Sequence, residues 1–74
     1  MNLKYFSESE FNRCTPACKM SDCKDFALRM LDAMRDYAGV PIILNSAYRS
    51  KEYEKKKGRT GSSSHCKGVA FDIL

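Results

Sequence analysis

The sequence predicts one small α+β domain in which helices pack on a small antiparallel sheet. Apolar residues at helical spacing fill the first half of the chain, and two short runs with strand character follow in the second half. This order of segments is typical of α+β domains. A length of 74 residues leaves no room for a second domain.

A short helix is expected over residues 8–13. Ser7 and Glu10 have the spacing of a capping box, and Phe6 and Phe11 are placed to form a hydrophobic staple across the start of this helix. The Thr-Pro pair at positions 15 and 16 ends the helix, because proline disfavours helical backbone at the residue before it.

A longer helix is expected from Asp22 to the residue before Gly39. Gly39 is a natural helix stop, and Pro41 prevents the helix from continuing. Apolar residues recur at steps of three and four along one face, which predicts that this face, with its methionines, is buried in the core. These residues are Phe26, Ala27, Met30, Leu31, Met34, Tyr37 and Ala38.

The second half of the chain begins with a short apolar run and a polar helix. Residues 42–44 are apolar and mostly β-branched, so we expect a strand that is buried on both faces. Ser50 is placed to cap a helix over residues 51–57. The KEYEKKK run of this helix is interpreted as a solvated surface with one or two Glu–Lys pairs.

The chain ends in a loop and a second strand. Residues 58–68 contain no apolar anchor and predict a flexible loop. Residues 69–74 alternate as a strand does, with Val69, Phe71 and Ile73 on one side. Two strands are marginal as an independent sheet, and the second is still running at Leu74. We therefore expect residues 1–74 to be the N-terminal portion of a larger, truncated domain.

The charge of the chain suits anionic partners. Thirteen Lys and Arg against nine Asp and Glu give a net charge of +4. A nucleic-acid partner is not expected, because the KEYEKKKGR run mixes Glu with Lys and has no interleaved aromatic platform. No stretch approaches the roughly 20 apolar residues of a membrane span, and the N-terminus lacks the apolar core of a signal peptide. We expect a monomer that is synthesised in the cytoplasm.

The sequence leaves several roles possible for the four cysteines. Cys14, Cys18, Cys23 and Cys66 could provide a structural zinc knuckle, although the usual Cys-x-x-Cys spacing is absent. Cys66 as a nucleophile with its neighbour His65 is disfavoured, because adjacent strand residues point to opposite faces. Ordinary thiols, or one pair that pins the N-terminal loop, are the favoured readings.

The one histidine of the chain, His65, lies seven residues before Asp72. A lone histidine near a strand is more often a surface or core residue than a ligand. Asp72 weighs against that reading, because aspartate is depleted from strands and this one is flanked by Phe71 and Ile73. Imidazole nitrogen and carboxylate oxygen are a common pair of zinc ligands, and catalytic zinc sites use three protein ligands.

These residues belong to a longer motif. Ser63, His65, Gly68, Ala70 and Asp72 match S-x-H-x-x-G-x-A-x-D, which resembles the zinc D-alanyl-D-alanine carboxypeptidase family. This family includes phage endolysin peptidases and shares its fold with hedgehog signalling domains. Upstream, the NSAYRS segment is similar to the S-G-Y-R-S segment of the family, and KYFSESEF resembles the opening of its smaller members.

The resemblance implies roles for individual residues. His65 and Asp72 would be two zinc ligands, and Ser63 would help to hold the substrate peptide. Arg49 would face the site and pair with a substrate carboxylate or with the oxyanion of the tetrahedral intermediate. Without the motif, a surface salt bridge would be the simpler role for Arg49.

The chain also departs from the pattern of the family. The third ligand, a histidine, and the general-base glutamate lie in a later segment of the family, and no second histidine is present here. None of the glutamates is assigned as the base. Ser64 replaces a common glutamine and Ala47 a common glycine, and both changes concern substrate fit.

The resemblance implies a zinc metallopeptidase, a carboxypeptidase or endopeptidase that hydrolyses the peptide stems of bacterial peptidoglycan. A phage or bacterial origin is expected. Without the third ligand and the base, this chain alone is expected to be inactive. The enzyme would act at the cell wall once released from the cytoplasm. The alternative is a non-catalytic, degenerate relative of the same fold that binds peptidoglycan.

Overall fold

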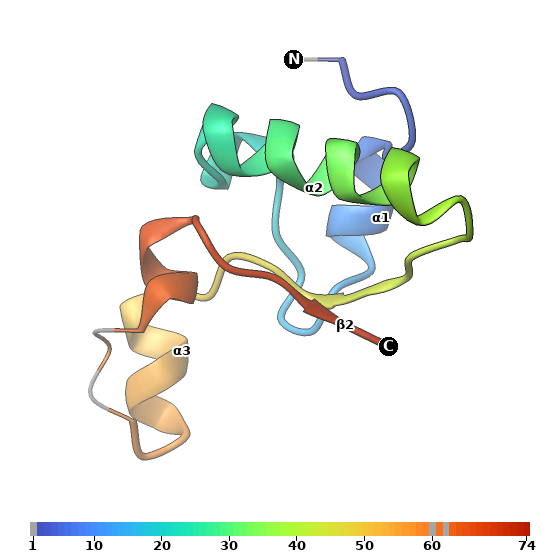
Figure 1. Cartoon of the computed structure of the whole chain (residues 1–74). Helices are drawn as coiled ribbons and strands as arrows, with labels where there is room; N and C mark the ends of the chain where they lie inside the picture. The colour runs from blue at the N-terminus through green and yellow to red at the C-terminus, as the bar shows by residue number, and fades with distance from the viewer. Residues whose placement is uncertain (1, 60, 62) are drawn as a thin grey trace.

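The computed structural model describes residues 2–59, 61 and 63–74. Its three α-helices pack with a two-stranded antiparallel sheet, so the predicted α+β class is confirmed. In Figure 1, α2 runs above the strands, and α3 lies below them at the lower left. In chain order the elements are α1 (Glu8–Asn12), the 3-10 helix η1 (Met20–Asp22), α2 (Asp25–Ala38), β1 (Leu44–Ser46), α3 (Lys51–Lys56), the 3-10 helix η2 (Ser64–Lys67) and β2 (Asp72–Ile73).

The sheet is short and irregular. Leu44 pairs with Ile73 and Ser46 pairs with Asp72, so three residues of β1 face two of β2, as in a β-bulge. Only Leu44 of the predicted strand over residues 42–44 lies in β1, and Ile43 is 60% exposed. The expectation of a strand buried on both faces is therefore wrong, because the buried side chains of β1, Leu44 and Ser46, alternate with an exposed one.

The core lies among α1, α2 and the start of β1. Phe6 and Phe11 are both buried in it, as the predicted hydrophobic staple requires. The buried residues of this cluster are Phe6, Phe11, Cys14, Cys18, Met20, Cys23, Leu28, Leu31, Leu44 and Ala47.

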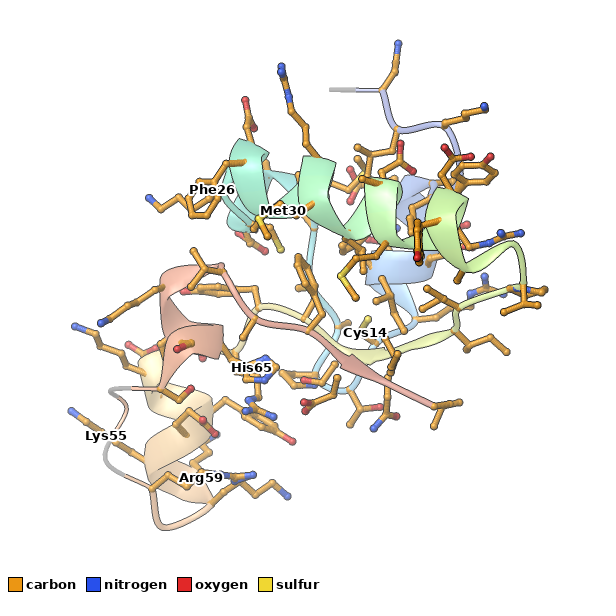
Figure 2. All side chains as sticks on the ribbon, in the orientation of Figure 1. Cys14, Phe26, Met30, Lys55, Arg59 and His65 are labelled. Atoms are coloured by element: carbon orange, nitrogen blue, oxygen red, sulfur yellow. The ribbon has the colours of Figure 1, made fainter. Side chains whose placement is uncertain are left out.

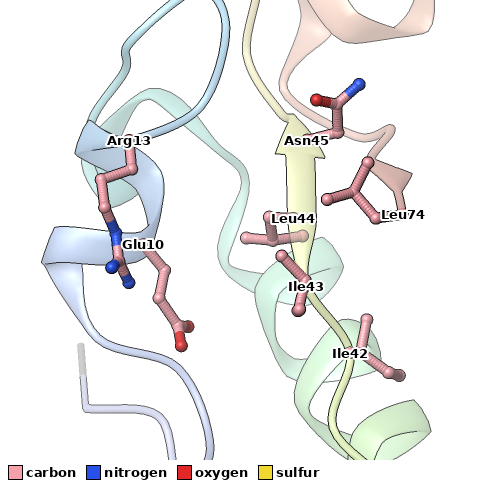
Figure 3. Close-up of a pocket in the computed structure, with 7 residues that line it drawn as sticks. All are labelled: Glu10, Arg13, Ile42, Ile43, Leu44, Asn45 and Leu74. Carbon is pink, nitrogen blue, oxygen red and sulfur yellow. The ribbon is translucent and has the colours of Figure 1, made fainter.

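The start of α1 differs from the prediction. Ser7 occupies the N-cap position, but its side chain makes no capping hydrogen bond, and its hydroxyl lies 3.0 Å from that of Ser9. The Glu10 side chain lines a pocket between α1 and β1 instead of reaching back to the helix start (Figure 3). The predicted capping box is therefore wrong.

The second helix begins later than predicted and buries a different face. η1 precedes α2, which starts at Asp25 and ends at Gly39 with a left-handed φ of 68°. The stripe predicted to be core is mostly exposed: Phe26 is 59%, Met30 61% and Tyr37 96% exposed. The core takes the face that carries Leu28 and Leu31, while the side of α2 that carries Phe26 and Met30 (Figure 2) borders a shallow apolar pocket of about 150 Å³.

The third helix matches the prediction at its start. The Ser50 hydroxyl caps α3 by accepting a hydrogen bond from the Tyr53 amide at 3.1 Å. The reading of KEYEKKK as a solvated surface is wrong at Glu54, which is fully buried.

The predicted loop over residues 58–68 contains η2, so its last residues are helical. Thr60 and Ser62 of this loop lie outside the described residues. Among the helices of the described residues, none combines the length and the apolar character that crossing a membrane requires.

Candidate metal centre

His65 is buried on η2, and its ring is held by a backbone group. Nδ1 lies 2.6 Å from the carbonyl oxygen of Ala47. A carbonyl oxygen can only accept a hydrogen bond, so Nδ1 carries the proton and donates it. Metal-binding histidines commonly donate their second ring nitrogen in this way, which orients the ring and leaves Nε2 facing the metal.

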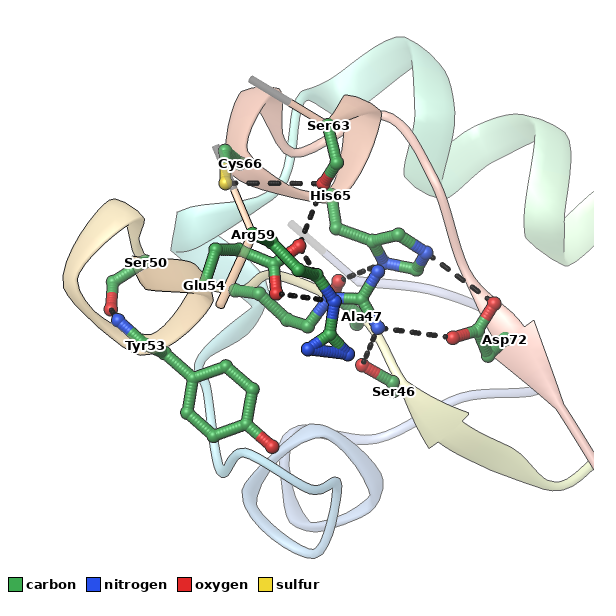
Figure 4. Close-up of polar contacts among 11 residues, drawn as sticks. Ser46, Ala47, Ser50, Tyr53, Glu54, Arg59, Ser63, His65, Cys66 and Asp72 are labelled. Atoms are coloured by element: carbon green, nitrogen blue, oxygen red, sulfur yellow. Dashed lines mark hydrogen bonds and ion pairs between the residues drawn. The ribbon is translucent and has the colours of Figure 1, made fainter. Parts of the chain in front are cut away.

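Nε2 of His65 faces the carboxylate of Asp72 on β2. The distance from Nε2 to Oδ1 of Asp72 is 3.4 Å (Figure 4). Two lone-pair atoms that face each other need a cation, either a proton on Nε2 or a metal ion, to be stable together. Two ligand atoms that each lie about 2.0–2.1 Å from a tetrahedral zinc are about 3.3–3.4 Å apart. The pair therefore has the donor types and the separation of two neighbouring zinc ligands.

A glycine turn joins these two residues. Gly68 ends η2 with a φ of 74°, in the left-handed region that favours glycine. A Cβ at this position would lie 2.5 Å from the carbonyl oxygen of Asp22, and the Gly68 carbonyl accepts a hydrogen bond from the Lys24 amide at 2.9 Å. The turn thus packs directly on the segment before α2, and the chain then leaves it toward β2.

Arg49 follows β1 and reaches the same carboxylate. Its Nη1 lies 3.3 Å from Oδ2 of Asp72 and 3.5 Å from the Ser46 hydroxyl. Its backbone amide donates to the carbonyl oxygen of His65 at 3.3 Å, so the two predicted site segments are also joined through the backbone. The Arg49 side chain is 15% exposed and that of Asp72 is 50% exposed, so this ion pair lies at the surface of the protein.

Ser63 lies at the N-cap position of η2, two residues before His65. Its hydroxyl donates to Oε1 of Glu54 at 3.1 Å and lies 3.9 Å from the Cys66 sulfur. The structure therefore places Ser63, Arg49, His65 and Asp72 in one connected set of polar contacts (Figure 4).

The described residues do not bring a complete set of metal ligands together. Within residues 2–59, 61 and 63–74, no group of three or more His, Cys, Asp or Glu side chains could hold a metal ion.

The cysteine-rich zinc knuckle is wrong for this structure. All four cysteines are free, and three of them are core residues. Burial raises the pKa of Cys14 to about 11 and that of Cys23 to about 12, and burial also raises the pKa of Cys18. Among the described residues, no three His, Cys, Asp or Glu side chains are placed to hold a metal ion together, as a knuckle requires.

A sequence profile of the Peptidase M15 family matches residues 4–74, nearly the whole chain. The chain belongs to the Peptidase M15 family. The resemblance inferred from the S-x-H-x-x-G-x-A-x-D motif is therefore confirmed at the level of the family. No curated protein and no solved structure matches this M15 chain closely enough to serve as a relative.

Sequence reasoning missed one residue of this M15 site, Glu54. Its carboxylate lies 3.4 Å from Nε of Arg49 and 3.3 Å from Nε of Arg59. Glu52, two residues earlier in the same helix, is exposed, and nothing in the KEYEKKK run distinguishes the two glutamates. Glu54 differs from Glu52 only because α3 is placed so that Glu54 contacts Arg49 and Ser63.

A pocket on another side of the M15 chain is separate from these residues. It has a volume of about 410 Å³ and contains none of the predicted site residues. Its lining residues are Glu10, Arg13, Ile42, Ile43, Leu44, Asn45 and Leu74 (Figure 3).

Proposed function

We propose that this chain contributes to a zinc metallopeptidase that hydrolyses the peptide stems of bacterial peptidoglycan. His65 and Asp72 would bind the zinc ion, and Ser63 and Arg49 would bind the substrate peptide. The observation that carries the proposal is the 3.4 Å separation of Nε2 of His65 from Oδ1 of Asp72, with Nδ1 of the same ring already committed to a carbonyl oxygen. Membership of the Peptidase M15 family supports it.

A bound zinc ion would polarise the scissile carbonyl and lower the pKa of a water molecule toward about 7. The side chains of this chain would prepare that chemistry. The Ala47 carbonyl keeps the proton of His65 on Nδ1, so that Nε2 presents its lone pair. The Arg49 guanidinium, next to Asp72, would stabilise negative charge on the substrate carboxylate or on the oxyanion.

The first test is zinc affinity, measured by competition with a chromophoric chelator. We expect His65→Ala and Asp72→Ala each to weaken binding by at least about tenfold. Asp25→Ala removes an exposed carboxylate at the start of α2 and should leave the affinity unchanged. Zinc bound equally well by the wild type and by both site variants would overturn the proposal.

Cys66→Ala distinguishes a zinc ion held at His65 and Asp72 from one held by a thiol. Cys66 is the cysteine that lies outside the core cluster, and its sulfur is close to Ser63. We expect Cys66→Ala to retain zinc. Loss of binding in this variant, together with retention in His65→Ala, would assign the metal to the thiol.

The second test is hydrolysis of a peptide that ends in D-alanyl-D-alanine and of purified peptidoglycan. It uses a protein that also carries the third ligand and the general base, because residues 1–74 alone are expected to be inactive. Release of free D-alanine would indicate a carboxypeptidase, and shortened internal stems would indicate an endopeptidase. Binding of peptidoglycan without either product would favour the non-catalytic relative of the same fold.

A further inference from the structure

Glu54 is a fully buried carboxylate in a stretch of the chain that is otherwise polar and exposed. Its exposed fraction is 0%, while Glu52, Lys55 and Lys56 of the same helix are exposed. Burying an ionised carboxylate is unfavourable unless charges or hydrogen bonds compensate it. For Glu54, this compensation comes from the side chains of Arg49, Arg59 and Ser63.

Three groups surround the Glu54 carboxylate (Figure 4). Oε1 accepts a hydrogen bond from the Ser63 hydroxyl at 3.1 Å and lies 3.4 Å from Nε of Arg49. Oε2 lies 3.3 Å from Nε of Arg59. The two arginine contacts have the distance of ion pairs but not the geometry of hydrogen bonds. Glu54 therefore links the two residues that we propose to bind substrate.

The Arg49 guanidinium is consequently held at both ends. Glu54 attracts its Nε, while Asp72 and Ser46 contact its Nη1. A guanidinium fixed in this way needs little reorganisation when an anion binds, which is the usual benefit of a preorganised charge.

Arg59 completes the charge balance of this group. The carboxylates of Glu54 and Asp72 face the guanidinium groups of Arg49 and Arg59. Arg59 offsets the charge of Glu54, so Glu54 can orient Arg49 without cancelling the attraction of Arg49 for an anion. Arg59 is placed for this by its backbone amide, which donates to the Glu54 carbonyl oxygen at 2.8 Å. Its side chain is about half exposed, so its contribution is mainly electrostatic.

We propose that Glu54, with Arg59 as its second counter-ion, is a positioning residue that orients Arg49 and Ser63 toward the carboxylate of the substrate peptide. This inference rests on the proposed function, because Arg49 and Ser63 matter to it as substrate-binding residues.

The test uses two readouts on the full chain. The first is the Nε–H resonance of Arg49 in a nitrogen–proton correlation spectrum, assigned by its loss in Arg49→Ala. The second is the affinity for N-acetyl-D-alanyl-D-alanine, measured by titration in the same spectra. The variants are Glu54→Gln, which keeps the side-chain shape and removes the charge, and Glu52→Gln, the matched exposed control.

We expect Glu54→Gln to shift the Arg49 Nε–H resonance, because the charge nearest to Nε is removed, and to weaken peptide binding by about tenfold. Glu52→Gln should leave both readouts unchanged. In an Arg49→Ala background, Glu54→Gln should weaken binding no further, because a positioning residue acts through the residue that it holds. An unchanged resonance and an unchanged affinity in Glu54→Gln would overturn the inference.

A second variant keeps the inference testable if Glu54→Gln fails to fold. Arg59→Gln leaves Glu54 paired with Arg49, so the Arg49 resonance should persist while the peptide affinity falls several-fold, because the charge of Glu54 is no longer offset by Arg59. Equal affinity in Arg59→Gln and the wild type would overturn the role of Arg59.

Failure of the proposed function looks different from failure of this inference. If Arg49→Ala binds the peptide as well as the wild type does, the substrate role of Arg49 fails. The resonance of Arg49 in Glu54→Gln then still decides whether Glu54 orients that side chain.

Discussion

Nη1 of Arg49 lies 3.3 Å from Oδ2 of Asp72, on the carboxylate whose other oxygen faces His65. A fixed positive charge at this position competes with a metal cation for Asp72. We therefore expect Arg49→Gln to bind zinc several-fold more tightly than the wild type does. Chelator competition measures the change, and Arg13→Gln, which removes an exposed arginine just after α1, serves as the control. Weaker zinc binding in Arg49→Gln would contradict this prediction.

Gly68→Ala should destabilise the protein far more than Gly39→Ala does. Both glycines have positive φ values, 74° and 68°, but a Cβ at Gly68 would lie 2.5 Å from a backbone oxygen, whereas one at Gly39 would have nothing within 4 Å. We expect a loss of about 2–5 kcal/mol in the free energy of unfolding for Gly68→Ala and about 1 kcal/mol for Gly39→Ala. Urea denaturation followed by circular dichroism compares the two, and equal losses would argue against the close packing of the Gly68 turn.

Phe11→Ala and Phe26→Ala should have very different effects on stability. Phe11 is fully buried in the core cluster, whereas Phe26 is 59% exposed on α2. Removing a buried phenylalanine costs about 3–5 kcal/mol, and in a chain of this size such a loss can unfold the protein. We expect Phe26→Ala to cost less than about 1 kcal/mol. Thermal unfolding of both variants tests which residues form the core, and a larger loss for Phe26→Ala would place the core on the face that the sequence predicted.

The stability of the protein should decrease as the pH rises above about 9. Burial raises the pKa of Cys14 from 9.0 to about 11 and that of Cys23 from 9.0 to about 12. In this window the folded state keeps protons that the unfolded state releases, so stability is complete below pH 9 and is lost as the pH rises toward the folded pKa values. Urea midpoints at pH 8, 9 and 10 measure this decrease, and Cys23→Ala should make it shallower. An identical pH dependence in Cys23→Ala would contradict the contribution of this thiol.

Local features of the fold were predictable from the sequence. Ser50 caps α3 and Gly39 ends α2 as predicted, because a cap or a left-handed glycine depends on the few residues around it. The motif also identified the family, and it named the pair His65 and Asp72 whose nitrogen and oxygen face each other in the structure.

Burial was harder to predict because it depends on packing between distant segments. Helical spacing showed that Phe26 and Leu31 share an apolar side of α2, but only the placement of α1 and β1 decided that Leu31 is buried and Phe26 is exposed. Likewise, Ser7 and Glu10 have capping-box spacing, yet the Glu10 side chain lines the pocket beside β1.

By itself, the sequence determined the α+β class, the Ser50 cap of α3, the Gly39 stop of α2 and the family-level motif, since these depend on local backbone preferences and on residue identity. The tertiary structure alone decided that Glu54, and not Glu52, becomes the buried partner of Arg49, Arg59 and Ser63. The physical reason is that a carboxylate can be buried only where opposite charges and hydrogen-bond donors from other segments converge on it, and the sequence of one helix does not specify that convergence.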